Sequence, residues 1–296
     1  MDRRATGVLI LALVLFTAAV VPSLQPKAVA GRASMGAVPL PPHIGQCLLQ
    51  NPPDPAVLVS AQQSYRLGSC AGTHYGEVAR ISQSPTASPD STAPAAVDPC
   101  VDLSGYLGWK PPVTSATDVR WQPISLSVVK MVPVALQAAF GQHWVACVVT
   151  PQITGTSYSG SIRNAMSTGL LPTAFASCHV SIEVDQAGVI DCREPHRYEM
   201  FAYAMLSNGF RDQRTLDRDC RKIVRAATGR ADPSAAGALS ISSTPFHLDS
   251  AGNAGPGYPD ALTNPDAEGV CAVRVLGSRL LAGSLFGIAE KALPWA

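Results

Sequence analysis

The sequence predicts an α+β protein built of two tandem small domains that are stapled by disulfides, each with a short antiparallel sheet and one main helix. Two observations carry this prediction: eight cysteines fall into two sets of four, and the residues around the two sets match in the same order. A chain of 296 residues with 47% apolar side chains is long enough for two ordinary domains with cores of their own.

The first 30 residues have the pattern of an export signal. Arg3 and Arg4 precede an uncharged apolar run at residues 7–21, and an Ala-x-Ala motif ends at Ala30. The run is short for a membrane span, which needs about 20 residues, so a cleaved signal peptide and a retained N-terminal membrane anchor both remain open. In either case we expect the body outside the cytoplasm, anchored to the cell membrane and facing outward, or secreted into the cell envelope. A proline-rich linker at residues 31–43 follows.

The charge balance excludes several classes of partner. The formal net charge is +1, and loss of residues 1–30 would bring it to about −1. A nearly neutral protein has no electrostatic reason to hold nucleic acid or an anionic membrane surface. We therefore expect no nucleic-acid partner, and contact with a membrane only through the N-terminal segment.

The two sets of cysteines mark an internal repeat. Successive cysteines are 23, 30 and 47 residues apart in the first set, and 14, 28 and 51 apart in the second. Both sets contain the pattern C-x3-H-x2-E followed by an apolar residue, and both precede a Gly-Ser-(Ile/Leu) landmark. A repeat of about 120 residues indicates two copies of a domain, at residues 44–166 and 174–289, rather than a solenoid. The cysteines are Cys47, Cys70, Cys100 and Cys147, then Cys178, Cys192, Cys220 and Cys271.

Each copy is expected to contain, in order, two short strands, the His-containing turn, a strand, a helix and further strands. Residues 77–81 alternate apolar and polar side chains, and residues 199–205 are strongly strand-like. Apolar residues three and seven positions after Cys100 and after Cys220 predict an amphipathic helix with the cysteine on its buried face. Cys147-Val148-Val149 and Cys271-Ala272-Val273 are each expected to lie in a buried strand. A Ser/Thr/Pro tract at residues 83–96 and a polar insertion at residues 247–268 are expected outside the cores.

An even number of cysteines in an exported chain predicts a disulfide framework. If each copy is closed on itself, three pairings remain possible within each copy. We favour joining the first cysteine to the second and the third to the fourth, because this staples neighbouring strands and ties the helix to the sheet. The favoured set is Cys47–Cys70, Cys100–Cys147, Cys178–Cys192 and Cys220–Cys271.

The pairs His74/Glu77 and His196/Glu199 are the candidate site residues, because they recur in both copies. A histidine and a carboxylate three residues apart beside a cysteine could hold zinc or transfer protons. Alternatively, the imidazole caps a turn and the carboxylate accepts backbone N–H groups. We favour the structural role, since oxidised cysteines lack the thiolates that bind zinc well. No metal, cofactor or catalytic residue is predicted.

One short motif points to an enzyme. Ser127-Val-Val-Lys130 matches the S-x-x-K pattern of penicillin-interacting enzymes. The companion S-D-N and K-T-G patterns are absent from the sequence, and the segment is typical of a strand before Pro133. Trp144 is expected to pack in a core. The sequence thus contains no complete catalytic constellation.

The landmarks of the first copy are Gly45-Gln46-Cys47, the Cys70–Val78 turn, Cys100, the Gly141–Cys147 segment and Gly160-Ser161-Ile162. The second copy has Cys192, Pro195-His196, Glu199, Cys220, Cys271 and Gly283-Ser284-Leu285. This combination resembles the actinobacterial septum formation domain, an extracytoplasmic module of cell-envelope proteins. The second copy departs from the pattern, because no glycine precedes Cys178 at the matching position and Glu268 replaces the tryptophan.

The resemblance implies a link to septum formation and cell division but no defined biochemical activity. Together with the missing catalytic constellation, it predicts a non-enzymatic, extracytoplasmic interaction module whose partners are envelope or divisome proteins. The alternative is a metal-binding protein or metal-dependent hydrolase that uses the duplicated His/Glu turns.

Overall fold

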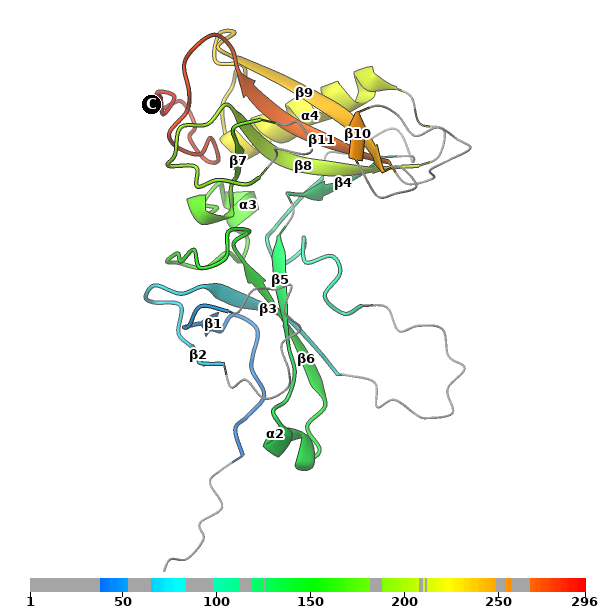
Figure 1. Cartoon of the computed structure of the whole chain (residues 1–296), viewed down its shortest axis with the longest axis vertical. Coiled ribbons are helices and arrows are strands. Elements are labelled where there is room, and N and C mark those ends of the chain that lie inside the picture. Colours follow the sequence, from blue (N-terminus) through cyan, green and yellow to red (C-terminus); the bar gives the residue numbers. More distant parts are fainter. Residues whose placement is uncertain are drawn as a thin grey trace, which may run out of the picture. The chain divides into compact units, whose positions relative to one another are not determined.

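Two antiparallel sheets and three α-helices make up the described part of the computed structural model, which is residues 38–52, 65–83, 98–111, 119–124, 126–181, 188–207, 210, 212–248, 254–256 and 267–296 (Figure 1). The α+β class with antiparallel sheets is the one predicted from the sequence. The predicted export segment at residues 1–30, the Ser/Thr/Pro tract after Gln83 and most of the 247–268 insertion lie outside the described residues. No helix within the described ranges is long and apolar enough to cross a membrane.

The first sheet has the strand order β2-β1-β3-β6-β5, with every neighbouring pair antiparallel. Its strands confirm those predicted near Glu77, Ser127 and Cys147. The short helix α2 (Ala135–Ala139) lies in the connection between β5 and β6. The strand bounds are β1 Cys47–Leu48, β2 Leu67–Gly68, β3 Gly76–Gln83, β5 Ser127–Met131 and β6 Trp144–Thr150.

The second sheet has the order β10-β9-β11-β8-β4, and β7 also pairs with β8. The strand-like segment at residues 199–205 is confirmed as the centre of β8, and the strand predicted at Cys271 is confirmed as β11. The bounds are β4 Val119–Pro123, β7 Ser177–His179, β8 Tyr198–Leu206, β9 Leu239–Leu248, β10 Ala254–Pro256 and β11 Ala267–Val275.

Strand β4 joins the second sheet although it lies within the first predicted copy. Residues Val119–Pro123 pair antiparallel with Leu206–Ala202 of β8. Trp121 of β4 is buried in the core that contains the residues of α4 and β11. This pairing was not predicted, because β4 has no landmark in the sequence that separates it from the strands of the first sheet.

The helix predicted at Cys220 is confirmed as α4 (Gln213–Thr228), which packs on β8, β9 and β11 (Figure 1). Leu216, Cys220, Ile223, Val224 and Ala227 form its buried stripe. The side chain of Asp212 caps the first turn by accepting from the backbone N–H of Thr215, and Gly229 ends the helix in the left-handed conformation.

The structure differs from the sequence prediction after Cys100, where residues 98–108 form successive turns rather than an amphipathic helix. Cys100, Leu103 and Leu107 are nevertheless buried, as the spacing predicted. Asp102 has a positive φ of 58°, and its carboxylate accepts from the backbone N–H and the hydroxyl of Ser104. Local side-chain bonds of this kind, with Gly105 and Gly108 nearby, favour turns over a helix.

The two sheets repeat the same register around their glutamates. Cys47 lies opposite Glu77, and Cys178 lies opposite Glu199. In the first sheet the pairing of β3 with β6, the strand of Cys147, skips Ala79. In the second sheet the pairing of β8 with β11, the strand of Cys271, skips Phe201. A bulge two residues after each glutamate bends the strand locally, so both glutamates sit in matching backbone surroundings.

Candidate functional site

All eight cysteines are paired in four disulfides. The pairs are the set favoured from the sequence: Cys47–Cys70, Cys100–Cys147, Cys178–Cys192 and Cys220–Cys271. Cys47–Cys70 and Cys178–Cys192 lie beside the two His/Glu turns. Cys100–Cys147 ties the segment after strand β3 to strand β6, and Cys220–Cys271 ties helix α4 to strand β11. The sulfur atoms therefore have no thiolate chemistry to offer in this state.

The two histidines are fully buried and occupy the same local arrangement. His74 Nδ1 lies 2.7 Å from the carbonyl oxygen of Gly72, and His196 Nδ1 lies 2.8 Å from that of Glu194. Because a carbonyl oxygen can only accept, Nδ1 carries the hydrogen in both rings. Burial lowers the pKa of His196, against the opposing effect of its bond to the Glu194 carbonyl, so the neutral ring is favoured.

Each histidine also fixes a distant backbone segment. The backbone N–H and C=O of His74 both bond to Tyr158, each at 2.9 Å, and those of His196 bond to Leu281 in the same way and at the same distance. The His74 ring makes an edge contact with the Tyr158 ring, with centroids 4.2 Å apart. The histidines thus brace the segments that lead to the two Gly-Ser landmarks.

The two glutamates complete this bracing, in an arrangement that we call the glutamate clamps. Glu77 accepts from the backbone N–H of Ile162 at 2.8 Å and from the Ser161 hydroxyl at 2.7 Å. Glu199 accepts from the backbone N–H of Leu285 at 2.7 Å and from the Ser284 hydroxyl at 2.6 Å. The Gly-Ser-(Ile/Leu) landmarks found in the sequence are therefore the segments that donate hydrogen bonds to the two glutamates.

The clamps differ in one donor. The hydroxyl of Tyr106 also donates to Glu77, and burial followed by this bond raises the pKa of Tyr106, so the phenol stays protonated. Tyr106 lies six residues after Cys100, while the residue six positions after Cys220 is Ala226, which has no donor. Burial raises the pKa of Glu199 to about 7, although its bonds from Ser284 and Leu285 act in the opposite sense.

A metal fits these turns poorly. A nitrogen of His74 and the sulfurs of Cys47 and Cys70 lie within 4.8 Å of one another, as do a Glu199 oxygen and the sulfurs of Cys178 and Cys192. The sulfurs are bonded to each other, and zinc binds thiolates rather than disulfides. The two groups also use a histidine in one turn and a glutamate in the other. The donor sets are therefore neither equivalent nor suited to zinc.

The S-x-x-K motif is not assembled into a site. Ser127 and Lys130 lie three residues apart on strand β5, so their side chains point to opposite faces of the sheet. Lys130 forms an ion pair with Asp98 at 2.5 Å. Trp144 is buried in the first sheet, where its Nε1 donates to Gln142 at 3.1 Å, as expected of a core residue.

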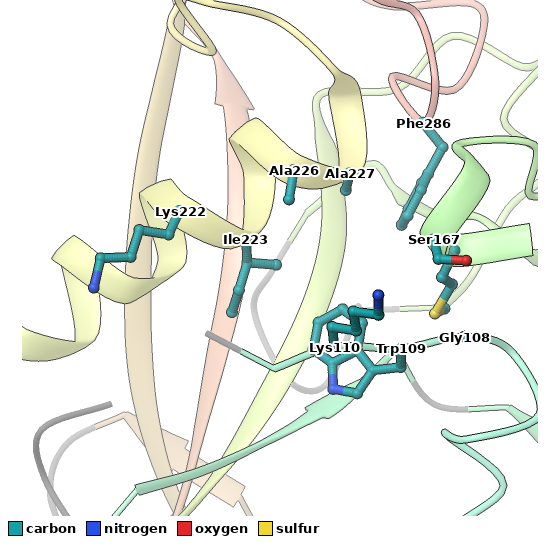
Figure 2. Close-up of a pocket in the computed structure, with 10 residues that line it drawn as sticks. Gly108, Trp109, Lys110, Ser167, Lys222, Ile223, Ala226, Ala227 and Phe286 are labelled. Carbon is teal, nitrogen blue, oxygen red and sulfur yellow. The ribbon is translucent and has the colours of Figure 1, made fainter. Parts of the chain in front are cut away.

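Helix α4, helix α3 (Ala165–Thr168), the turn at residues 108–110 and Phe286 enclose a pocket of about 510 Å³ (Figure 2). Sequence reasoning missed it, because its walls come from four segments that are far apart in the chain. The lining residues are Gly108, Trp109, Lys110, Met166, Ser167, Lys222, Ile223, Ala226, Ala227 and Phe286.

The fold and these sites define a disulfide-stapled α+β protein whose recurring polar residues serve to hold backbone segments in place. The chain belongs to the septum formation family, whose model matches residues 44–250. This membership confirms the resemblance seen in the sequence and suggests a role in cell division. Comparison with curated proteins and with solved structures found no significant match.

Proposed function

We propose that the protein is an extracytoplasmic, non-enzymatic interaction module of the cell envelope that assists septum formation by binding an envelope or divisome protein. One observation carries the proposal. The recurring titratable residues, which are the two His/Glu pairs, use their hydrogen bonds to hold backbone segments in place. Buried groups that are used in this way support a scaffold rather than a reaction centre.

The placement outside the cytoplasm is supported by the disulfides. Four closed pairs are typical of proteins from oxidising compartments and uncommon in the bacterial cytoplasm. The arginine-headed apolar run at the N-terminus points the same way. A pull-down from envelope membranes, with the N-terminal segment intact and a cross-linker added before extraction, would identify the partner.

The alternative function is metal binding or metal-dependent hydrolysis at the His/Glu turns. Native mass spectrometry of the exported protein separates the two proposals. Four disulfides with no bound metal would support the interaction module. Free thiols with stoichiometric zinc would refute it and favour the metal protein.

Replacing His196 with alanine tests whether the turn is structural. We expect the variant to lose about 2–3 kcal/mol of unfolding free energy, because a fully buried, packed ring is removed. Partner capture, normalised to the folded fraction, should stay unchanged. The exposed His143 provides a matched control, since its replacement with alanine should change neither quantity. Lost capture with an unchanged melting temperature would contradict the structural role.

A further inference from the structure

We propose that the pocket between α4, α3, the 108–110 turn and Phe286 binds an amphipathic anion: a single-chain carboxylate whose apolar tail lies in the pocket and whose head group meets Lys110. The proposal goes beyond the proposed function, because it concerns a small ligand and not the partner protein.

The walls are suited to an apolar tail. Trp109, Ile223 and Phe286 provide large apolar surfaces, and Ala226 and Ala227 leave room beside them (Figure 2); Met166 also lines the pocket. Met166 is an unbranched thioether, a side chain that adapts to a flexible chain. An aliphatic tail removed from water against these side chains gains the free energy of apolar burial.

The charges of the pocket select an anion. Of the lining residues in the described part of the chain, two are lysines and none is acidic. Lys222 is already paired with Asp219, at 3.1 Å. No ion pair neutralises Lys110 within the described ranges. Lys110 therefore has a positive charge available for a carboxylate head group.

The size of the pocket favours a small molecule over a protein surface. Its volume of about 510 Å³ lies within the range of roughly 300–1,000 Å³ that small-ligand pockets occupy. A stable protein interface instead buries about 800 Å² on each partner, usually over a flatter area.

The glutamate clamps hold the pocket in shape. Glu77 binds Tyr106, which precedes the 108–110 turn, and the Ser161-Ile162 segment, which precedes helix α3. Backbone bonds of 2.9 Å then join Asn164 to Tyr106 and Met166 to Leu107.

The second clamp acts on the part of the wall that contains Phe286. Glu199 binds Leu285, and the N–H of Phe286 donates to the Ser284 hydroxyl at 3.1 Å. Walls that are fixed before a ligand arrives lose less conformational entropy on binding. The duplicated turns thus preform a site that neither copy would make alone.

Calorimetric titration of the full-length oxidised protein tests the proposal. Dodecanoate, kept below its micelle concentration, should bind saturably with one molecule per chain. Butanoate has the same head group without the tail, and dodecyltrimethylammonium has the same tail with the opposite charge. Both should bind at least about tenfold more weakly if the tail and the anion are each required. Fluorescence of Trp109 in the wall provides a second readout.

Three variants locate the site. Lys110→Met should weaken dodecanoate binding about fivefold, the effect of one ion pair of about 1 kcal/mol. Ala226→Phe, at an exposed helix position, should fill the pocket and weaken binding more than tenfold. Arg221→Met removes the same charge from the exposed face of α4, outside the pocket, and should leave binding unchanged.

Several results would overturn the proposal. These are the absence of saturable dodecanoate binding, equal binding of the cationic amphiphile, and an Ala226→Phe variant that binds as the wild type does. If Ala226→Phe abolished capture of the partner protein while the wild type bound no dodecanoate, the pocket would belong to the protein interface. The proposed function would then stand and the small-ligand proposal would fall.

Discussion

Replacing Glu199 with glutamine should remove a pH dependence from the stability of the protein. The carboxyl group is fully buried, and within the described ranges it accepts hydrogen bonds from the Ser284 hydroxyl and the Leu285 N–H. Burial raises its pKa from the usual 4.5 to about 7. The folded state therefore holds a proton on Glu199 at pH values where the unfolded chain has lost it.

The sign and size of the effect follow from proton linkage. Between pH 4.5 and pH 7 the folded protein binds more protons than the unfolded chain, so the unfolding free energy falls as the pH rises. The stability that the protonated Glu199 contributes is fully present below pH 4.5 and is lost as the pH rises through 7. The difference between the two pKa values corresponds to a loss on the order of 3 kcal/mol. A glutamine resembles the protonated acid and does not titrate.

Urea denaturation followed by tryptophan fluorescence, at several pH values from 4.5 to 8, measures this effect. The unfolding free energy of Glu199→Gln, relative to that of the wild type, should rise by about 3 kcal/mol between pH 4.5 and pH 8. His196 acts in the opposite direction, because its lowered pKa makes stability fall as the pH drops below 6.5, but it is present in both proteins and cancels. The exposed Glu194 is the matched control, and Glu194→Gln should parallel the wild type. Parallel curves for Glu199→Gln and wild type would refute the reasoning.

Two further predictions concern the framework. Replacing both cysteines of Cys220–Cys271 with alanine should cost about 4 kcal/mol in urea denaturation, against about 3 kcal/mol for Cys178–Cys192, since the bonds join residues 51 and 14 positions apart. A larger loss for the shorter loop would contradict this account. Gly287→Ala should lower the melting temperature far more than Gly237→Ala. Both glycines have a positive φ, but only at position 287 would the new Cβ meet a backbone oxygen, at 1.9 Å. Equal melting temperatures would show that the close packing at Gly287 is relaxed easily.

Local patterns made much of the fold predictable. The cysteine spacing favoured the four disulfides, and apolar periodicity located α4, β8 and β11, because these signals depend on residues close together in the chain. The segment after Cys100 shows the limit of periodicity. Leu103 and Leu107 are buried as a helical stripe would be, yet Asp102, Gly105 and Gly108 favour turns.

The candidate site was predictable in part. The recurrence of His74/Glu77 and His196/Glu199 identified residues with a shared role, and backbone N–H groups were expected as partners of the glutamates. The backbone N–H groups that the glutamates hold lie some 85 residues further along the chain, as in the bond from Ile162 to Glu77. The Gly-Ser landmarks of both segments were visible in the sequence, but local patterns did not show that they pair with the glutamates. The pocket was invisible for the same reason, because four distant segments build it.

The pairing of β4 with β8 has a consequence for how the chain can be divided. Strands β4 and β7 together cover the outer edge of β8 from Tyr198 to Leu206. A fragment that starts at residue 174 would lack β4 and uncover the edge at Ala202–Leu206. Unpaired strand edges recruit strands from other molecules. The second sheet is therefore completed by a strand that the first half supplies, and a cut between the two halves would remove β4 from it.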